Sequence, residues 1–393
     1  MDRRVWILTI AAFVVGTVEL VIAGIIEMIA QDLQVSVAAA GQLVTVYSLV
    51  FAFGSPVIIA LTANMERRRL LIIAMWVFFA GNILSIISPN FTILLISRVV
   101  LAASCSVIII LSITLAASIV PPALKGRAIG IIFMGLSAAL MLGVPLGTWI
   151  GDRWGWRMTF VLIAVLTFIV ALCVQRFLPK APPQPSVSLR TQLGTLKSSK
   201  ILSAHLISIL QMTGQFTIYA YITPYLQKTM GLSAPLISLV LLVYGLAGIA
   251  GGWIGGWSAD RLGPQKTIIL TLVLHAAAVL LLPYAASNML SLLLVVAVWC
   301  TFNMAPSPAI QSYLIETAPE SADIQLGFNT SSLHIGVALG SIVGGLIVSQ
   351  YGISVNPAAG GVIILLSILS ALYSMTRKKK NDAGRADHLK SCL

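Results

Sequence analysis

The chain has 393 residues, of which 58% are hydrophobic and only 9% are charged, and its mean hydropathy is +0.99. Soluble domains contain roughly 45–50% apolar and about 25% charged residues, so this composition excludes a soluble globular protein and indicates an integral membrane protein. The formal net charge of +12 would suggest a nucleic-acid ligand in a soluble protein. In a membrane protein its interpretation depends on where the basic residues lie relative to the spans.

The apolar segments are long enough to cross a bilayer many times. A helix needs about 20 apolar residues to span the hydrocarbon core. Twelve segments meet this requirement, at approximately 5–30, 37–61, 70–88, 91–119, 128–150, 157–178, 201–226, 233–257, 267–286, 289–313, 326–349 and 355–376. The sequence therefore predicts an all-α membrane protein with twelve transmembrane helices.

The basic residues gather on one side of these spans. With the N-terminus inside the cell, only Arg153, Arg157 and Lys228 fall on the outer side, and Arg98 lies within a span. This asymmetry follows the positive-inside rule and predicts that both termini are cytoplasmic. The basic tail, 377–393, is interpreted as a topology anchor, with binding of acidic lipids as an alternative.

The first span carries a carboxylate near its centre. It reads FVVGTVELVIAGIIEMIA over 13–30 and includes Glu19. A charge in hydrocarbon costs about 2.5–3.5 kcal/mol on insertion scales, so such residues face protein or water and are functional by default. Gly16 and Ala23 share its helix face, which predicts that Glu19 points into the bundle. We interpret Glu19 as a proton carrier; the alternative is a cavity carboxylate that only orders nearby groups.

Two further charged residues are predicted to lie at a similar depth in the membrane to this carboxylate. Arg98, in the fourth span, is roughly 10 Å from the outer end and Glu19 roughly 16 Å, at 1.5 Å per helical residue. Long side chains can bridge that difference, so Arg98 is the predicted partner of Glu19 in proton coupling. Glu27 lies nearer the outer end and is interpreted as a water-facing residue rather than a second carrier.

The fifth span contains a run of small residues, GLSAALMLGVPLG, at 135–147. Gly143 and Gly147 allow neighbouring helices to pack closely, and Pro145 bends the helix because it lacks a backbone donor. These three residues are predicted to take part in gating, with ordinary small-residue packing as the alternative.

A polar stretch then divides six spans from six. Residues 179–200 hold four prolines and four basic residues, which predicts a cytoplasmic linker. At an offset of 197, the first-half glycines align without a gap on those of the second half, and the pairs are Gly130 with Gly327, Gly143 with Gly340, Gly147 with Gly344, and Gly155 with Gly352. The pattern indicates a duplicated six-helix bundle, 1–178 and 201–376, with the repeats parallel in the membrane.

The second half lacks the two charges. The offset places Phe216 where the first half has Glu19, and Val295 where it has Arg98. Its polar and aromatic residues are the predicted substrate-binding set: Gln211, Gln215, Tyr219, Trp299, Asn303, Asn329 and His334.

The first three of these recur every four residues and share a helix face. Aromatic rings and amides suit a flat, neutral, nitrogen-rich solute such as a purine. The alternative is that each amide bonds a neighbouring helix, and that the isolated histidines are packing residues.

The segment after the eighth span reads GWSADRLGPQK, at 256–266, and is predicted to be a loop. Gly256 would allow close helix approach, Gly263 a tight turn, and Asp260 and Arg261 a hydrogen-bonded latch that holds the inner face shut. The alternative is a polar turn with an incidental Asp-Arg pair. Its spacing resembles the cytoplasmic-loop motif of the major facilitator superfamily. The equivalent first-half loop, 60–69, departs from that motif.

Other stretches sharpen the resemblance, which covers nearly the whole chain. The run at 135–147 resembles the signature of proton-coupled antiporters, and 16–33 and 153–160 resemble twelve-span drug:proton antiporters and sugar-efflux proteins. Residues 128–147 and 311–341 are similar to bacterial purine base and nucleoside efflux pumps. The resemblance implies a major facilitator fold of two six-helix bundles, and it places an arginine of the family at Arg98.

These observations favour a proton-coupled efflux antiporter of the bacterial cytoplasmic membrane, with purine bases or nucleosides as cargo. Drug or sugar efflux by the same mechanism is the alternative, and a membrane sensor or channel is a more distant one. The sequence holds no His-Glu-x-x-His run, Cys/His cluster or phosphate-binding Gly-Lys-Ser/Thr loop, so we expect neither an enzyme nor direct use of ATP. We expect no cofactor, no nucleic-acid partner and a monomer.

Overall fold

The computed structural model describes residues 2–62, 64–121, 124–182, 194–285 and 288–377. Within these ranges every regular element is a helix. Eleven helices are long and apolar enough to cross a membrane, and a bent pair raises the total to twelve, as the sequence predicts. Most of the predicted linker, and the tail after residue 377, lie outside the described residues.

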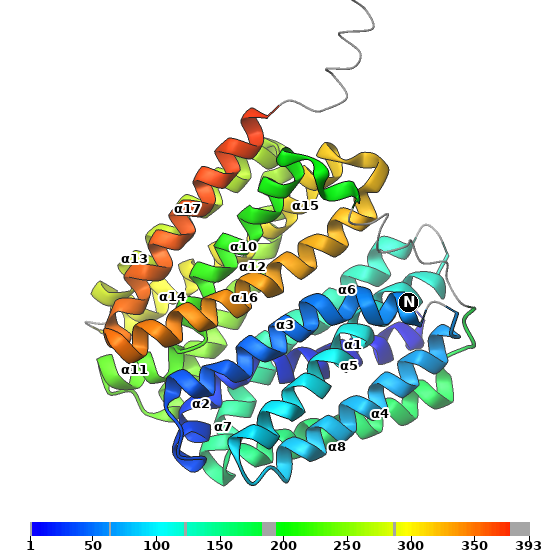
Figure 1. The fold of residues 1–393 in the computed structure, drawn as a ribbon, viewed down its shortest axis with the longest axis horizontal. Coiled ribbons are helices and arrows are strands. Elements are labelled where there is room, and N and C mark those ends of the chain that lie inside the picture. Colours follow the sequence, from blue (N-terminus) through cyan, green and yellow to red (C-terminus); the bar gives the residue numbers. More distant parts are fainter. Residues whose placement is uncertain (1, 63, 122–123, 183–193, 286–287, 378–393) are drawn as a thin grey trace, which may run out of the picture.

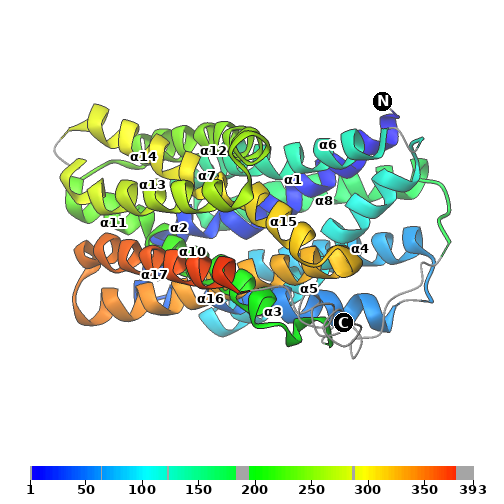
Figure 2. The same cartoon turned by 90° about the horizontal axis from the view of Figure 1, so that it is seen from above.

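The helices form two groups that follow each other along the chain (Figure 1). The first group contains α1 (Arg3–Leu20), α2 (Ile22–Asp32), α3 (Val37–Leu61), α4 (Arg67–Ile86), α5 (Phe91–Ser118), α6 (Lys125–Ala138), α7 (Val144–Trp154) and α8 (Trp156–Phe177). The second contains α10 (Ser199–Tyr219), α11 (Ile222–Met230), α12 (Ala234–Leu262), α13 (Pro264–Ala285), α14 (Met289–Met304), α15 (Pro306–Thr317), α16 (Ala322–Gln350) and α17 (Asn356–Thr376). Seen from above, the long helices run in roughly the same direction (Figure 2).

Asparagine caps set the start of matching helices in the two halves. The side chain of Asn90 accepts a hydrogen bond from the backbone N–H of Ile93 at the start of α5, and that of Asn288 accepts one from Ser291 at the start of α14. Each cap satisfies a backbone donor that has no partner within the helix. The predicted starts of these spans, 91 and 289, are therefore confirmed.

The first span is not one straight helix. Helices α1 and α2 meet at Val21 with a bend of 47°, where the hydropathy pattern predicts an uninterrupted span over 5–30. The seventh span divides in the same way, because α10 ends at Tyr219 and α11 begins at Ile222. Hydropathy reports burial in lipid and carries no signal for a bend of this kind.

The fifth span changes its helical winding before its proline. Residues Ala139–Gly143 form a π-helical turn, and Pro145 follows at the first turn of α7, where its missing N–H does least harm. A Cβ on Gly143 would collide with Thr17 of α1, and one on Gly147 would collide with Val21. These small residues thus bring the fifth span against the first, as expected.

The aligned glycines have matching surroundings in both halves. Gly155 and Gly352 follow α7 and α16 with φ of 89° and 86°, a region that favours glycine. Gly340 leaves no room for a Cβ against Thr213 of α10, as Gly143 leaves none against α1. These agreements support the duplication inferred from the sequence.

The segment 256–266 is mostly helical, which corrects the predicted loop. Helix α12 continues to Leu262, and only Gly263 has left-handed geometry, with φ of 82°. A Cβ on Gly256 would meet nothing within 4 Å, so the predicted close approach at Gly256 is wrong. The close approaches occur at Gly251 and Gly255, one helical turn apart, against the backbones of α14 and of the residue that links it to α15.

The predicted latch at the end of α12 is not formed in this conformation. Asp260 is exposed and hydrogen-bonds no described residue. The guanidinium of Arg261 instead lies 5.2 Å from the centre of the Trp257 ring. The two halves meet at the opposite end, where Thr223 Oγ1 donates to the carbonyl of Ala23 at 2.8 Å and Ser341 Oγ to that of Gly41 at 2.8 Å.

Candidate functional site

A cavity of about 380 Å³ lies between the two halves. Helices α1, α3, α5 and α6 line it on one side, and α10, α12, α14, α15 and α16 on the other. Its size falls within the range of small-molecule sites. Most of the lining is apolar, and the ionisable or polar members are Glu19, Gln215, Tyr219, Tyr244, Asn303, Ser307, Gln311, Thr330 and His334.

Glu19 is the only acidic residue among those that line the cavity. It lies two residues before the bend at Val21, on the face where Gly16 packs against α6. Its Oε1 is 3.6 Å from Nδ1 of His334 on α16, and the His334 ring stacks on Phe51 of α3 with centroids 3.8 Å apart. The carboxylate of the first half and an imidazole of the second half therefore face each other inside the cavity.

Arg98 occupies a different place from the one predicted. No ion pair or hydrogen bond joins it to Glu19 in the described part of the chain. Its guanidinium donates to the carbonyls of Val18 at 3.1 Å and Leu43 at 3.4 Å, and lies 4.2 Å from the centre of the Tyr47 ring. Arg98 is fully buried behind the cavity wall, where it ties α5 to α1 and α3. The direct pairing is therefore wrong for this conformation, in which Nε and Nη1 bond backbone carbonyls of α3 and α1, while Nη2 has no hydrogen-bond partner among the described residues.

Four of the seven predicted substrate-binding residues line the cavity: Gln215, Tyr219, Asn303 and His334. Gln211 and Trp299 are buried behind them. Asn329 does not line the cavity, and its Oδ1 accepts a hydrogen bond from Ser208 at 2.6 Å. For Gln211 and Asn329 the structure therefore agrees with the alternative, in which an amide bonds a neighbouring helix.

The polar residues of the second half form one connected network. Gln215 Oε1 accepts from Trp299 Nε1 at 2.7 Å and pairs with His275 Nε2 at 3.0 Å, while Gln215 Nε2 donates to the Tyr244 hydroxyl at 2.6 Å. Asn303 Nδ2 donates to the same hydroxyl at 3.2 Å. The network joins α10, α12, α13 and α14, and it presents Tyr244 at the cavity surface.

The sequence analysis missed several residues of this site, among them Phe51, Tyr244 and His275. Tyr244 stands alone in the apolar run LLVYGLAG, and a lone phenol in such a run usually has a buried hydrogen-bond partner, so this signal could have identified it. Phe51 and His275 carry no comparable pattern. Their roles depend on which helices face them.

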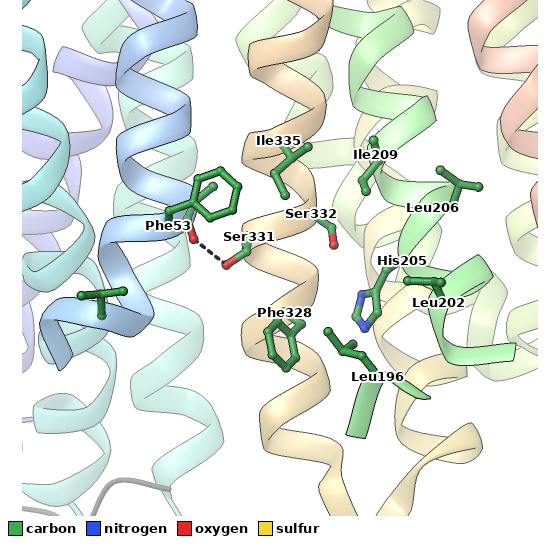
Figure 3. A pocket seen from close by; sticks show the side chains of 12 residues that line it. Phe53, Leu196, Leu202, His205, Leu206, Ile209, Phe328, Ser331, Ser332 and Ile335 are labelled. Atoms are coloured by element: carbon green, nitrogen blue, oxygen red, sulfur yellow. Dashed lines mark hydrogen bonds between the residues drawn. The ribbon is translucent and has the colours of Figure 1, made fainter. Parts of the chain in front are cut away.

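A larger cavity of about 660 Å³ lies between α3, α10 and α16 (Figure 3). Its lining is almost entirely apolar. Figure 3 shows Ser331 bonded across the boundary to α3, through its Oγ and the carbonyl of Ala52 at 3.0 Å. His205 also lies there, with its Nε2 2.9 Å from Gln325 Oε1. Since no carboxylate lines this cavity, we place the candidate site in the smaller one.

The described ranges hold no group of three or more His, Cys, Asp or Glu side chains that could bind a metal ion. What the smaller cavity offers is a first-half carboxylate that faces a second-half imidazole, with a hydroxyl and amide network on the second-half wall. This arrangement can hold a proton and a neutral solute within one enclosed space.

The sequence profile of the Major Facilitator Superfamily matches residues 8–322 and 204–391. The chain belongs to this superfamily. It is 32% identical over 377 residues to the uncharacterized MFS-type transporter YbcL of Bacillus subtilis, covering 96% of this chain and 97% of YbcL. It is 31% identical over 374 residues to the inner membrane transport protein YdhP of Escherichia coli, covering 94% and 95%.

Solved structures agree on the fold. The crystal structure of a D-xylose-proton symporter superposes with a TM-score of 0.77 at 17% identity, covering 96% of this chain and 98% of the symporter. At this identity the likeness shows the fold alone. This superfamily member is therefore a multi-pass membrane transporter with the major facilitator fold, and family and fold indicate transport rather than enzymatic catalysis.

Proposed function

We propose that this transporter is a proton-coupled efflux antiporter of the drug:proton branch, and that it exports purine bases or nucleosides by alternating access. The observation that carries the proposal is the position of Glu19, whose carboxylate lines a cavity shared by both halves and lies 3.6 Å from His334 Nδ1. A carboxylate in such a place is a functional group by default, because an idle charge there would only cost free energy.

The proposed cycle couples a proton on one wall to a solute on the other. Glu19 holds the proton, and the solute contacts the opposite wall at Gln215, Tyr219 and Asn303. Because both sites open into one cavity, a bound solute changes the surroundings of the carboxylate, and protonation changes the balance between the two conformations. Arg98 acts through the backbone near the bend of the first span and through its charge, without a direct contact to Glu19.

The opening and closing of the cavity would use the small-residue contacts of the fifth span and the end of α12. The proposed gating residues are Gly143, Pro145, Gly147, Asp260, Arg261 and Gly263; Gly256 makes no close approach here and is left out. Since Asp260 hydrogen-bonds no residue that the structure describes, its latch would form in the conformation that closes this end. We further propose a monomer in the bacterial inner membrane, with bundles 1–178 and 201–376 and both termini in the cytoplasm, that uses no cofactor.

Two comparisons support proton coupling. The sequence runs at 16–33 and 135–147 resemble those of proton-coupled antiporters, and the D-xylose-proton symporter with the same fold is named for its proton. Relatives of the chain in Bacillus subtilis and Escherichia coli are named as transporters without a stated cargo. The choice of purines comes from the resemblance at 128–147 and 311–341 and from the flat aromatic surfaces of the cavity.

Export of lipophilic drugs, or of sugars, by the same mechanism is the second candidate. The observation that favours drugs is the apolar part of the lining, to which Phe51, Ile109, Ile113, Phe133 and Leu136 contribute. A lipophilic cation would be stabilised there by burial of its apolar surface and by the carboxylate of Glu19.

The test is Glu19→Gln in proteoliposomes with an imposed pH gradient and labelled adenine, hypoxanthine or adenosine. We expect the variant to lose pH-driven uphill transport, because a glutamine cannot exchange a proton, while exchange of labelled for unlabelled solute persists. Glu27→Gln is the matched control, since it makes the same change in α2, outside the cavity lining. Uphill transport by Glu19→Gln at the parental rate would refute the carrier role. Export of lipophilic cations but no purine would refute the proposed cargo.

A further inference from the structure

The orientation of the Gln215 amide is determined by a group that can only donate. An indole N–H has no acceptor capacity, and Trp299 Nε1 lies 2.7 Å from Gln215 Oε1. The amide oxygen therefore faces Trp299, and the amide nitrogen must face the other way. That nitrogen is the Nε2 that donates to the Tyr244 hydroxyl oxygen at 2.6 Å.

The orientation of Asn303 is determined by a group that can only accept. Gln211 Nε2 donates to the backbone carbonyl of Asn303 at 3.0 Å and to Asn303 Oδ1 at 3.0 Å. Since a carbonyl has no proton to give, the Gln211 nitrogen must lie there, and Asn303 must present its oxygen to it. The Asn303 Nδ2 is then directed to the Tyr244 hydroxyl, at 3.2 Å.

Both chains of hydrogen bonds therefore end on the same oxygen. Tyr244 accepts from Gln215 and from Asn303, so its own hydroxyl proton cannot be given to either. The Cys300 thiol also hydrogen-bonds this hydroxyl, but sulfur is a weak acceptor, so the O–H proton can move to a better one. Tyr244 lines the cavity, where a solute can supply that acceptor.

A second hydroxyl beside it has no hydrogen-bond partner in the described part of the chain. It belongs to Tyr219, which is 2% exposed and lines the cavity, and the hydroxyl itself is buried. The rings of Tyr219 and Tyr244 stack with centroids 5.0 Å apart and planes 29° apart. A buried hydroxyl without a partner is costly, and the cost is removed when a ligand supplies the missing acceptor.

We propose that Tyr219 and Tyr244 are a pair of hydrogen-bond donors that select a planar, uncharged solute by its acceptors, a carbonyl oxygen or an aromatic ring nitrogen. The amides of Gln215 and Asn303, besides lining the cavity, then orient Tyr244. The proposal rests on the cavity assigned under the proposed function and adds the chemistry by which its second-half wall recognises cargo. A solute of the same shape without acceptors would leave both hydroxyls unpaired and bind poorly.

The test is equilibrium binding of tritiated hypoxanthine to the purified full-length protein, at one pH and without a gradient. We expect Tyr244→Phe and Tyr219→Phe each to weaken binding about tenfold, which is the effect of losing one buried hydrogen bond. Tyr313→Phe is the matched control, because that buried hydroxyl bonds Ser374 and does not line the cavity. Indole, a bicyclic ring system without an acceptor atom, should not compete with hypoxanthine.

Three results would overturn the donor pair. The first is parental affinity for hypoxanthine in both single variants, Tyr244→Phe and Tyr219→Phe. The second is competition by indole as strong as that by unlabelled hypoxanthine. The third is failure of the parent protein to bind any of hypoxanthine, adenine and nicotinamide. Melting curves would show that the variants are folded. A parent that binds hypoxanthine through these hydroxyls but does not move it with a pH gradient would keep the donor pair and refute antiport, so the two failures are distinguishable.

Discussion

The two walls of the cavity come from two halves whose glycines align in the sequence, yet they carry different chemistry. At the aligned positions Glu19 and Phe216, both side chains line the cavity, one from α1 and the other from α10. Behind the first stands Arg98, and the aligned residue in the second half is Val295. One half thus holds the charges, and the other holds a neutral network of amides, phenols and an indole.

The two halves share features of helix packing and backbone geometry, and they differ in the charged and polar residues that face the cavity. Gly155 and Gly352 have nearly the same backbone geometry, and Asn90 and Asn288 cap matching helices. Helix packing and turn geometry constrain both halves alike, whereas the proposed proton site is needed only once in a cavity. A second buried carboxylate would add a cost in free energy with no further solute-binding surface.

Among variants that remove the chemical difference between the two halves, Arg98→Ala should have the largest effect on stability. The carbonyls of Val18 and Leu43 would lose an ionic donor and a void would remain, so the free energy of unfolding should fall by about 3 kcal/mol. Val295→Ala, the aligned change in the second half, should cost roughly 1 kcal/mol. Thermal melting in detergent measures both. Equal losses would mean that Arg98 has no special structural role in its half.

The shared scaffold can be tested with Gly143→Val and Gly340→Val. Each added side chain would collide with the neighbouring helix, at Thr17 in the first half and at Thr213 in the second, so both variants should lose about 2 kcal/mol. Gly130→Ala and Gly327→Ala are the controls, because a Cβ there meets nothing within 4 Å and both should keep parental stability. Unequal losses in the two valine variants would show that the aligned contacts are not equivalent.

The smallest effect on stability is expected for Asp260→Asn, at the end of α12. Asp260 is exposed and hydrogen-bonds none of the described residues, so the free energy of unfolding should change by no more than an ordinary surface substitution changes it, about 0.5 kcal/mol. The transport rate should nevertheless fall, because the latch would be weaker in the conformation that closes this end. The corresponding first-half loop already carries Asn64, so the second half would come to resemble the first. A parental transport rate would remove Asp260 from gating.

Most of the fold could be predicted from the sequence, and much less of the site. Span positions follow from local hydropathy, and the start of α5 follows from one capping asparagine. The error at 256–266 came from the same reasoning, because charged residues end a hydropathy segment while the helix continues to Leu262. Helix α12 ends only at Gly263, where the backbone turns.

The sequence by itself determined that the chain spans a membrane many times, that glycines of its two halves align, and that Glu19 is costly where it lies, because hydropathy, spacing and charge are properties of local segments. Only the tertiary structure decided that His334 faces this carboxylate, that Arg98 does not touch it, and that Tyr244 ends a hydrogen-bond network. The physical reason is that such contacts depend on how each helix is rotated and bent against helices far away in the chain. No pattern within one helix records that rotation.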